Sequence, residues 1–91
     1  MKIDLDRIQK LYGESVIYNI KENLENVIGN MNYLITKGFN NVNEIIEQNP
    51  FLFIKSCEIF QEKIDSLIKN LGVEYIEKLE DNTFLWGEID D

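Results

Sequence analysis

Two short aromatic segments recur at a fixed distance in this chain, and this recurrence constrains the fold more than any other feature. The first is Asn49-Pro50-Phe51-Leu52-Phe53, and the second, 33 residues later, is Asn82-Thr83-Phe84-Leu85-Trp86. The same offset relates four further apolar pairs: Met31 with Ile64, Leu34 with Leu67, Ile35 with Ile68, and Ile46 with Leu79. Repeats of this length are typical of helical units that bury their apolar faces against one another. We therefore expect a tandem helical repeat of period about 33, with units at 24–56 and 57–89 and an N-terminal segment at 1–23.

The apolar residues of the chain follow helical spacing, and no segment alternates apolar and polar residues over the length of a strand. The spacing predicts helices over 3–12, 16–37, 42–48 and 73–80, a last turn at 84–86, and either one or two helices over 50–71 with a break at 55–56. In the 73–80 helix, Val73, Ile76 and Leu79 are expected to face inward. We predict one all-α domain over residues 1–91, a small bundle of stacked helical hairpins.

Glycine and serine residues mark several of the predicted helix boundaries. Gly13, Gly38 and Gly72 are predicted to end helices, because glycine readily takes the left-handed conformation of a C-terminal turn. Ser15 is predicted to cap the helix over 16–37 through its hydroxyl. Gly29 lies inside that helix, where glycine costs about 1 kcal/mol relative to alanine, so a bend or close packing is expected there.

The segment around the only proline joins the third helix to the fourth. Asn40 or Asn41 is expected to cap the helix over 42–48, and Pro50 suits the first position of a new helical turn. Residues 51–54 are all apolar, which is too continuous for one amphipathic face, so we expect them to be buried on most sides. Ser56 can cap the helix that follows.

Length and composition set limits on the class of protein. The 91 residues, 44% of them hydrophobic and 29% charged, are typical of one small soluble domain. No apolar run approaches the roughly 18 residues that a membrane span needs, and the first residues lack the apolar stretch of a signal peptide. The single Cys57 cannot form an internal disulfide and suits a reducing compartment, so the cytoplasm is the expected location.

Negative charge is concentrated near the C-terminal end of the sequence. The formal net charge is −8, and residues 74–91 contain seven acidic residues and only one lysine. A field of that sign repels phosphate backbones and attracts basic surfaces. Two interpretations stay open: a functional acidic surface, or an acidic end that only keeps the protein in solution.

The segment that begins at Asn49-Pro50 resembles the repeat of the mitochondrial transcription termination factor family. The resemblance covers Asn49 to Phe53, Ser56, Glu58, and then Lys63-Ile64, Leu67 and Leu71-Gly72. It implies a solenoid of helix triples, with one unit at 34–53 and the next at 67–86, where Thr83 takes the place of the proline. Members of that family are long basic arrays that bind nucleic acid along a positive groove. Because this chain is short and acidic, nucleic-acid binding does not carry over to it by default.

The residue inventory argues against an enzyme. The chain has no histidine and one cysteine, which removes His-based acid–base pairs, His metal sites and a structural zinc site. Cys57 is expected near the start of a helix, either as a small buried residue or as a thiol with raised thiolate character. Glu58, Glu62 and Asp65 share one helix face, which we interpret as solvated. We expect no cofactor, no metal and no catalytic residue.

An asparagine stripe supports an alternative function. Asn19, Asn23, Asn26 and Asn30 follow i, i+4, i+7 and i+11 spacing, and we expect them to form exposed polar surface. With Lys10, Lys21 and Lys37, such a stripe could contact nucleic-acid bases in a minimal nucleic-acid-binding repeat protein.

The favoured hypothesis is a non-enzymatic module that binds a protein with a basic surface. It could act as an inhibitor that mimics nucleic acid on a nucleic-acid-binding partner. Trp86 is expected either in the core or as an anchor on an open end of the stack, which a partner or a second copy would cover. The candidate partner-binding residues are Glu74, Glu77, Asp81, Trp86, Glu88, Asp90 and Asp91.

Overall fold

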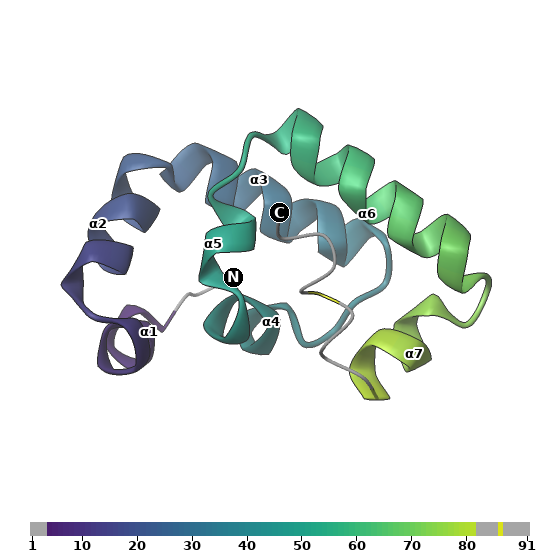
Figure 1. Cartoon of the computed structure of the whole chain (residues 1–91), viewed down its shortest axis with the longest axis horizontal. Coiled ribbons are helices and arrows are strands. Elements are labelled where there is room, and N and C mark those ends of the chain that lie inside the picture. The colour runs from purple at the N-terminus through teal and green to yellow at the C-terminus, as the bar shows by residue number, and fades with distance from the viewer. Residues whose placement is uncertain (1–3, 82–85, 87–91) are drawn as a thin grey trace.

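Seven α-helices follow one another in the computed structural model, which describes residues 4–81 and residue 86. The helices are α1 Leu5–Tyr12, α2 Glu14–Glu22, α3 Leu24–Thr36, α4 Val42–Gln48, α5 Pro50–Phe53, α6 Cys57–Leu71 and α7 Tyr75–Asp81. The described residues contain no strand, which confirms the all-α prediction. In Figure 1 the long helices α3 and α6 run along the upper side, α4 and α7 lie along the lower side, and α5 connects the two levels.

A left-handed glycine separates the first two helices. The Asp4 carboxylate caps α1 by accepting a hydrogen bond from the backbone N–H of Arg7 at 3.1 Å. Gly13 then takes φ +97° and allows the turn that leads into α2. The prediction for Ser15 is wrong, because α2 begins at Glu14 and has no side-chain cap. The predicted start of the first helix at residue 3 lies outside the described residues.

The predicted helix over 16–37 is two helices in the structure. The break is at Asn23, where the backbone has φ −117° and ψ 29°. The Asn23 side-chain Nδ2 donates to the carbonyl oxygen of Asn19 at 2.9 Å, while its backbone N–H contacts that same oxygen at 3.1 Å and that of Ile20 at 3.2 Å. The asparagine side chain thus competes with a backbone N–H group for a carbonyl oxygen of the helix, and such competition interrupts helices.

Gly29 lies within α3 because the neighbouring helix approaches closely there. A Cβ atom built on Gly29 would lie 2.8 Å from Sγ of Cys57, at the start of α6. Of the two predicted explanations for this glycine, the structure supports close packing. No break occurs at Gly29, since α3 continues to Thr36.

Gly38 ends α3 with a pair of backbone hydrogen bonds. Its N–H donates to the carbonyl oxygen of Ile35 at 3.0 Å, and the N–H of Phe39 donates to that of Leu34 at 3.2 Å. This is the Schellman arrangement, which needs the positive φ of +97° that Gly38 has. The predicted asparagine cap of α4 is only partly right: Asn41 is the N-cap residue, but its side chain makes no capping hydrogen bond.

The proline turn forms as predicted, with one correction. Pro50 begins the short helix α5, and a break follows before Ser56, whose hydroxyl caps α6 at the N–H of Ile59. Leu52 and Phe53 are buried and Ile54 is half-buried, but Phe51 is 46% exposed, so the predicted burial on most sides does not extend to Phe51. In the four-residue helix α5, the Phe51 side chain points away from the core, whereas Leu52 and Phe53 point inward.

The helix predicted over 73–80 begins later than expected. Gly72 ends α6 with φ +84°, and α7 starts only at Tyr75. The prediction that Val73 faces inward is wrong, because its side chain is 97% exposed in the turn before α7. Leu79 is buried as predicted, and Ile76 packs against the core.

Aromatic rings contact one another at two places in the core. Phe53 contacts Phe60 with ring centroids 5.4 Å apart. Phe39 contacts both Tyr75 and Trp86, at centroid distances of 5.8 and 5.5 Å. Trp86 is only 1% exposed, so of the two places expected for it the structure shows the core and not a surface anchor.

The two predicted repeat units share an order of elements. Each has a long helix, a glycine with positive φ, and a short helix: α3, Gly38 and α4 in one, α6, Gly72 and α7 in the other. Three of the apolar pairs related by the offset, together with Phe53 and Trp86, are buried in both units. The repeat period itself stays a prediction.

Candidate functional site

The acidic residues of α7 lie on its solvent-facing side. Glu74 precedes the helix and Glu77 and Asp81 lie within it, and all three are exposed. Glu80, which the sequence analysis did not select, is exposed as well. In the part of the chain that the structure describes, no ion pair involves any of these four carboxylates. All four carboxylates lie at exposed positions on one short segment of the chain.

The buried side of α7 fixes this orientation. Leu79 is buried in the core, and the Tyr75 hydroxyl donates to the carbonyl oxygen of Lys37 at 2.5 Å. The lysine of α7 is also committed to the protein: Nζ of Lys78 donates to the carbonyl oxygen of Leu71, at the C-terminal end of α6, at 2.7 Å. A cation is stabilised at that end of a helix. The positive charge of Lys78 is thus held at α6.

The short helix α4 carries carboxylates at positions equivalent to those of α7. Glu44 and Glu47 lie 33 residues before Glu77 and Glu80, so both short helices contain the pattern Glu-x-x-Glu in the same register of the predicted repeat. The repeat offset could have revealed this pattern in the sequence. Figure 1 shows α4 and α7 along the same lower side of the molecule. We call the six carboxylates of these two short helices and their flanks the acidic face: Glu44, Glu47, Glu74, Glu77, Glu80 and Asp81.

Of the other predicted partner-binding residues, the structure describes only Trp86. Trp86 is buried against Phe39, as described above. Glu88, Asp90 and Asp91 lie outside the described residues, so their place relative to the acidic face stays a prediction.

The asparagine stripe is not the exposed surface that was expected. Asn30 is 0% exposed, and Asn19, Asn23 and Asn26 are half-buried. The Asn30 amide Nδ2 donates to the carbonyl oxygens of Phe53 and Lys55, both at 2.9 Å. A buried amide holds the turn between α5 and α6 in this way, which is a structural role.

The remaining candidate groups lie between α3 and α6. Cys57 is half-buried, with Sγ 3.8 Å from the carbonyl oxygen of Asn26. The Tyr33 hydroxyl donates to the Asp65 carboxylate, and Nζ of Lys37 lies 3.8 Å from that carboxylate and 5.2 Å from the centre of the Tyr33 ring. Burial, and then the adjacent Asp65, raise the pKa of Tyr33 above its ordinary value. Among the described residues no group of His, Cys, Asp or Glu side chains is arranged to hold a metal ion.

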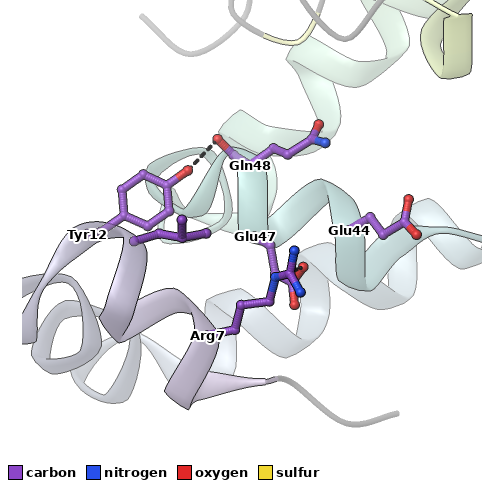
Figure 2. Close-up of a pocket in the computed structure, with 6 residues that line it drawn as sticks. Arg7, Tyr12, Glu44, Glu47 and Gln48 are labelled. Carbon is purple, nitrogen blue, oxygen red and sulfur yellow. Dashed lines mark hydrogen bonds and ion pairs between the residues drawn. The ribbon is translucent and has the colours of Figure 1, made fainter.

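A cleft of about 280 Å³ lies between α1 and α4, and Figure 2 shows its lining side chains. At one side the Tyr12 hydroxyl donates to the carbonyl oxygen of Gln48 at 2.8 Å. At another, Nε of Arg7 lies 3.2 Å from Oε2 of Glu47, whose side chain is only 17% exposed. Burial raises the pKa of Tyr12 above its ordinary value. The Glu44 side chain lies further along α4.

The fold and the acidic face define a small all-α protein built from short and long helices. No protein-family model, no curated protein and no solved structure matches this chain. The similarity to the mitochondrial transcription termination factor repeat therefore stays a prediction from the residues quoted for it. No helix within residues 4–81 is both long and apolar enough to cross a membrane.

Proposed function

We propose that this protein is a non-enzymatic binding module whose acidic face docks on a basic surface of another protein. The observation that carries the proposal is the arrangement of the six carboxylates of the acidic face. Four of them, Glu44, Glu47, Glu77 and Glu80, lie in equivalent positions of the predicted repeat, and all but Glu47, which pairs with Arg7, are exposed. The one lysine of α7 is bound to the end of α6. Exposed carboxylates attract basic surfaces such as those that bind nucleic acid. The partner is therefore a nucleic-acid-binding protein, and occupation of its basic groove would inhibit it.

The packing of α4 and α7 against the core supports a binding role for the acidic face. An acidic residue on a helix that merely frays at a chain end has no fixed position. Here Leu79 and the Tyr75 hydroxyl bond hold α7 against the core, and Val42, Ile45 and Ile46 do the same for α4. Fixed charges lose less conformational entropy on binding than mobile ones. We propose the cytoplasm as the site of action, because the unpaired thiol of Cys57 suits a reducing compartment.

The alternative function, direct nucleic-acid binding, has less support. Its asparagine stripe is half-buried to buried, and Lys37 is engaged by Asp65 and the Tyr33 ring. A gel shift at low salt separates the two proposals: direct binding predicts a complex with duplex DNA or RNA at micromolar protein, and the acidic-module proposal predicts none.

The partner hypothesis is tested by capture with matched charge variants. The tagged protein is incubated with extract of the cells that make it, and captured proteins are released with added duplex DNA. Neutralising Glu74, Glu77 and Asp81 (Glu74→Gln, Glu77→Gln, Asp81→Asn) should abolish capture of a basic protein that DNA can displace. The control Glu14→Gln, Glu22→Gln, Glu25→Gln changes the net charge by the same amount at exposed positions of α2 and α3, and should leave capture intact. Equal capture by both triple variants contradicts the proposal.

A further inference from the structure

We infer that α1 and α2 form an arm that two copies of this chain can exchange, with Asn23 as the hinge. In the exchanged dimer, α2 and α3 run as one straight helix, and the arm of each copy packs on α4 and α5 of the other. The inference goes beyond the proposed function and does not depend on it. Three features support it: the apolar pattern across Asn23, the hydrogen bonds at the bend, and the contacts that hold the arm.

The apolar pattern of the chain runs through the bend without interruption. Apolar residues recur at alternating intervals of three and four from α2 into α3, as in one continuous amphipathic helix: Ile17, Ile20, Leu24, Val27, Met31 and Leu34. In the bent structure Ile20 and Val27 are 0% exposed, but Leu24 between them is 44% exposed. The bend therefore takes one apolar side chain out of the stripe to which its spacing assigns it.

The helix α3 begins at the bend without a side-chain cap. Asn23 is its N-cap residue, but the Asn23 side chain turns back and donates to the carbonyl oxygen of Asn19. The first backbone N–H groups of a helix have no acceptor within that helix. In a straight helix they would donate to the carbonyl oxygens of the last turn of α2. Straightening at Asn23 therefore adds backbone hydrogen bonds at the hinge.

The bend brings the arm to its binding surface on α4 and α5. Figure 1 shows α2 descending from the start of α3 to α1 on the lower side of the molecule. There, Nε of Arg7 lies 3.2 Å from Oε2 of Glu47, and the Tyr12 hydroxyl donates to the carbonyl oxygen of Gln48 at 2.8 Å. The arm also contributes buried apolar side chains to the core, namely Ile8, Val16 and Ile20.

A second copy offers the same surface to the arm. A straight α2–α3 helix carries the arm away from its own α4 and α5, so all of these contacts are lost within one chain. They are regained when the arm packs on α4 and α5 of another copy, and that copy returns its own arm in the same way. Such an exchange closes a two-fold symmetric dimer.

The test refolds the whole protein from urea over a range of concentrations and measures the dimer fraction by size exclusion with light scattering. The wild-type protein should form a dimer whose fraction rises with concentration. Alanine favours a straight helix more than asparagine does, and the dimer contains two hinges, so Asn23→Ala should raise the association constant about ten-fold. Asn32→Ala makes the same change at an exposed position of α3 and should behave like the wild type. Equal dimer fractions in the two variants, or no dimer in any of the three proteins, would contradict the inference.

A charge exchange shows whether the arm joins the two copies. Arg7→Glu in one chain and Glu47→Arg in another, each combined with Asn23→Ala, place like charges across the arm contact in either chain alone. When the two chains are refolded together, each arm meets an opposite charge on the other chain. Native mass spectrometry should therefore find more mixed dimer than random pairing gives. A mixed fraction equal to random pairing would show that the dimer forms without exchange of the arm.

Discussion

Asn30 in α3 donates a hydrogen bond from Nδ2 to the carbonyl oxygen of Phe53, 23 residues later, at 2.9 Å. The same nitrogen reaches the carbonyl oxygen of Lys55. One buried amide thus satisfies two backbone groups in the turn that leads from α5 into α6. Replacement of Asn30 by alanine should leave these carbonyl groups unpaired and lower the free energy of unfolding by about 3 kcal/mol.

Urea unfolding followed by circular dichroism measures this loss. Asn32→Ala is the matched control, since Asn32 lies in the same helix and is exposed. It should change the free energy of unfolding by less than about 0.5 kcal/mol. Similar losses in the two variants would show that the Asn30 amide does not hold the turn.

The contact between Gly29 and Cys57 predicts a coupling between two substitutions. Alanine at position 29 improves helix propensity by about 1 kcal/mol, but its Cβ would lie 2.8 Å from Sγ of Cys57. In the wild-type background the clash should offset the gain. In a Cys57→Ala background the sulfur is gone, and Gly29→Ala should raise the free energy of unfolding by up to about 1 kcal/mol. Additive effects in the double-mutant cycle would contradict close packing at this position.

Gly38 and Gly13 allow backbone strain to be separated from a side-chain clash. Both have φ +97°, so alanine is strained at either position by about 1–2 kcal/mol. A Cβ on Gly13 meets nothing within 4 Å, whereas one on Gly38 would lie 2.9 Å from Cδ1 of Ile76 in α7. Thermal unfolding should therefore show a larger loss for Gly38→Ala than for Gly13→Ala. Ile76→Val, which shortens that side chain, should reduce the difference, and an unchanged difference would argue against the contact.

Burial of Trp86 gives a spectroscopic prediction, because it is the only tryptophan in the chain. Its fluorescence should be at short wavelength in the native protein, resist quenching by iodide, and shift to long wavelength on unfolding. Trp86→Ala should lower the free energy of unfolding by about 3–5 kcal/mol through loss of its packing against Phe39. Emission typical of a water-exposed indole in the native state would show that Trp86 lies at the surface and not in the core.

Local signals in the sequence predicted much of the fold. The ends of helices at Gly13, Gly38 and Gly72 depend on glycine alone, and the start of α5 depends on Pro50. These boundaries are set within a few residues of chain, so propensity is enough to find them. The bounds of α4 followed from its apolar spacing in the same way.

The features that the sequence did not reveal depend on contacts between distant segments or on competing local bonds. The apolar pattern continues across Asn23, which hides the break between α2 and α3. Asn30 is polar and repeats at helical spacing with three other asparagines, which predicted an exposed stripe, but its partners Phe53 and Lys55 come from a distant segment of the chain. The exposed acids of α7 followed from the helical spacing that turns Ile76 and Leu79 inward. The Glu-x-x-Glu pattern of α4 becomes visible only when its acids are compared with those of α7 across the repeat offset.

Binding of a basic ligand on the acidic face can be followed residue by residue in solution. The isotope-labelled protein is titrated with a nine-residue arginine peptide, and the amide chemical shifts are recorded by NMR. The largest shift changes should lie in α4 and α7, and those in α7 should disappear in the variant with Glu74, Glu77 and Asp81 neutralised. Largest changes in α2 and α3, around Glu22 and Glu25, or changes in α7 that persist in that variant, would show that the acidic face does not bind the peptide.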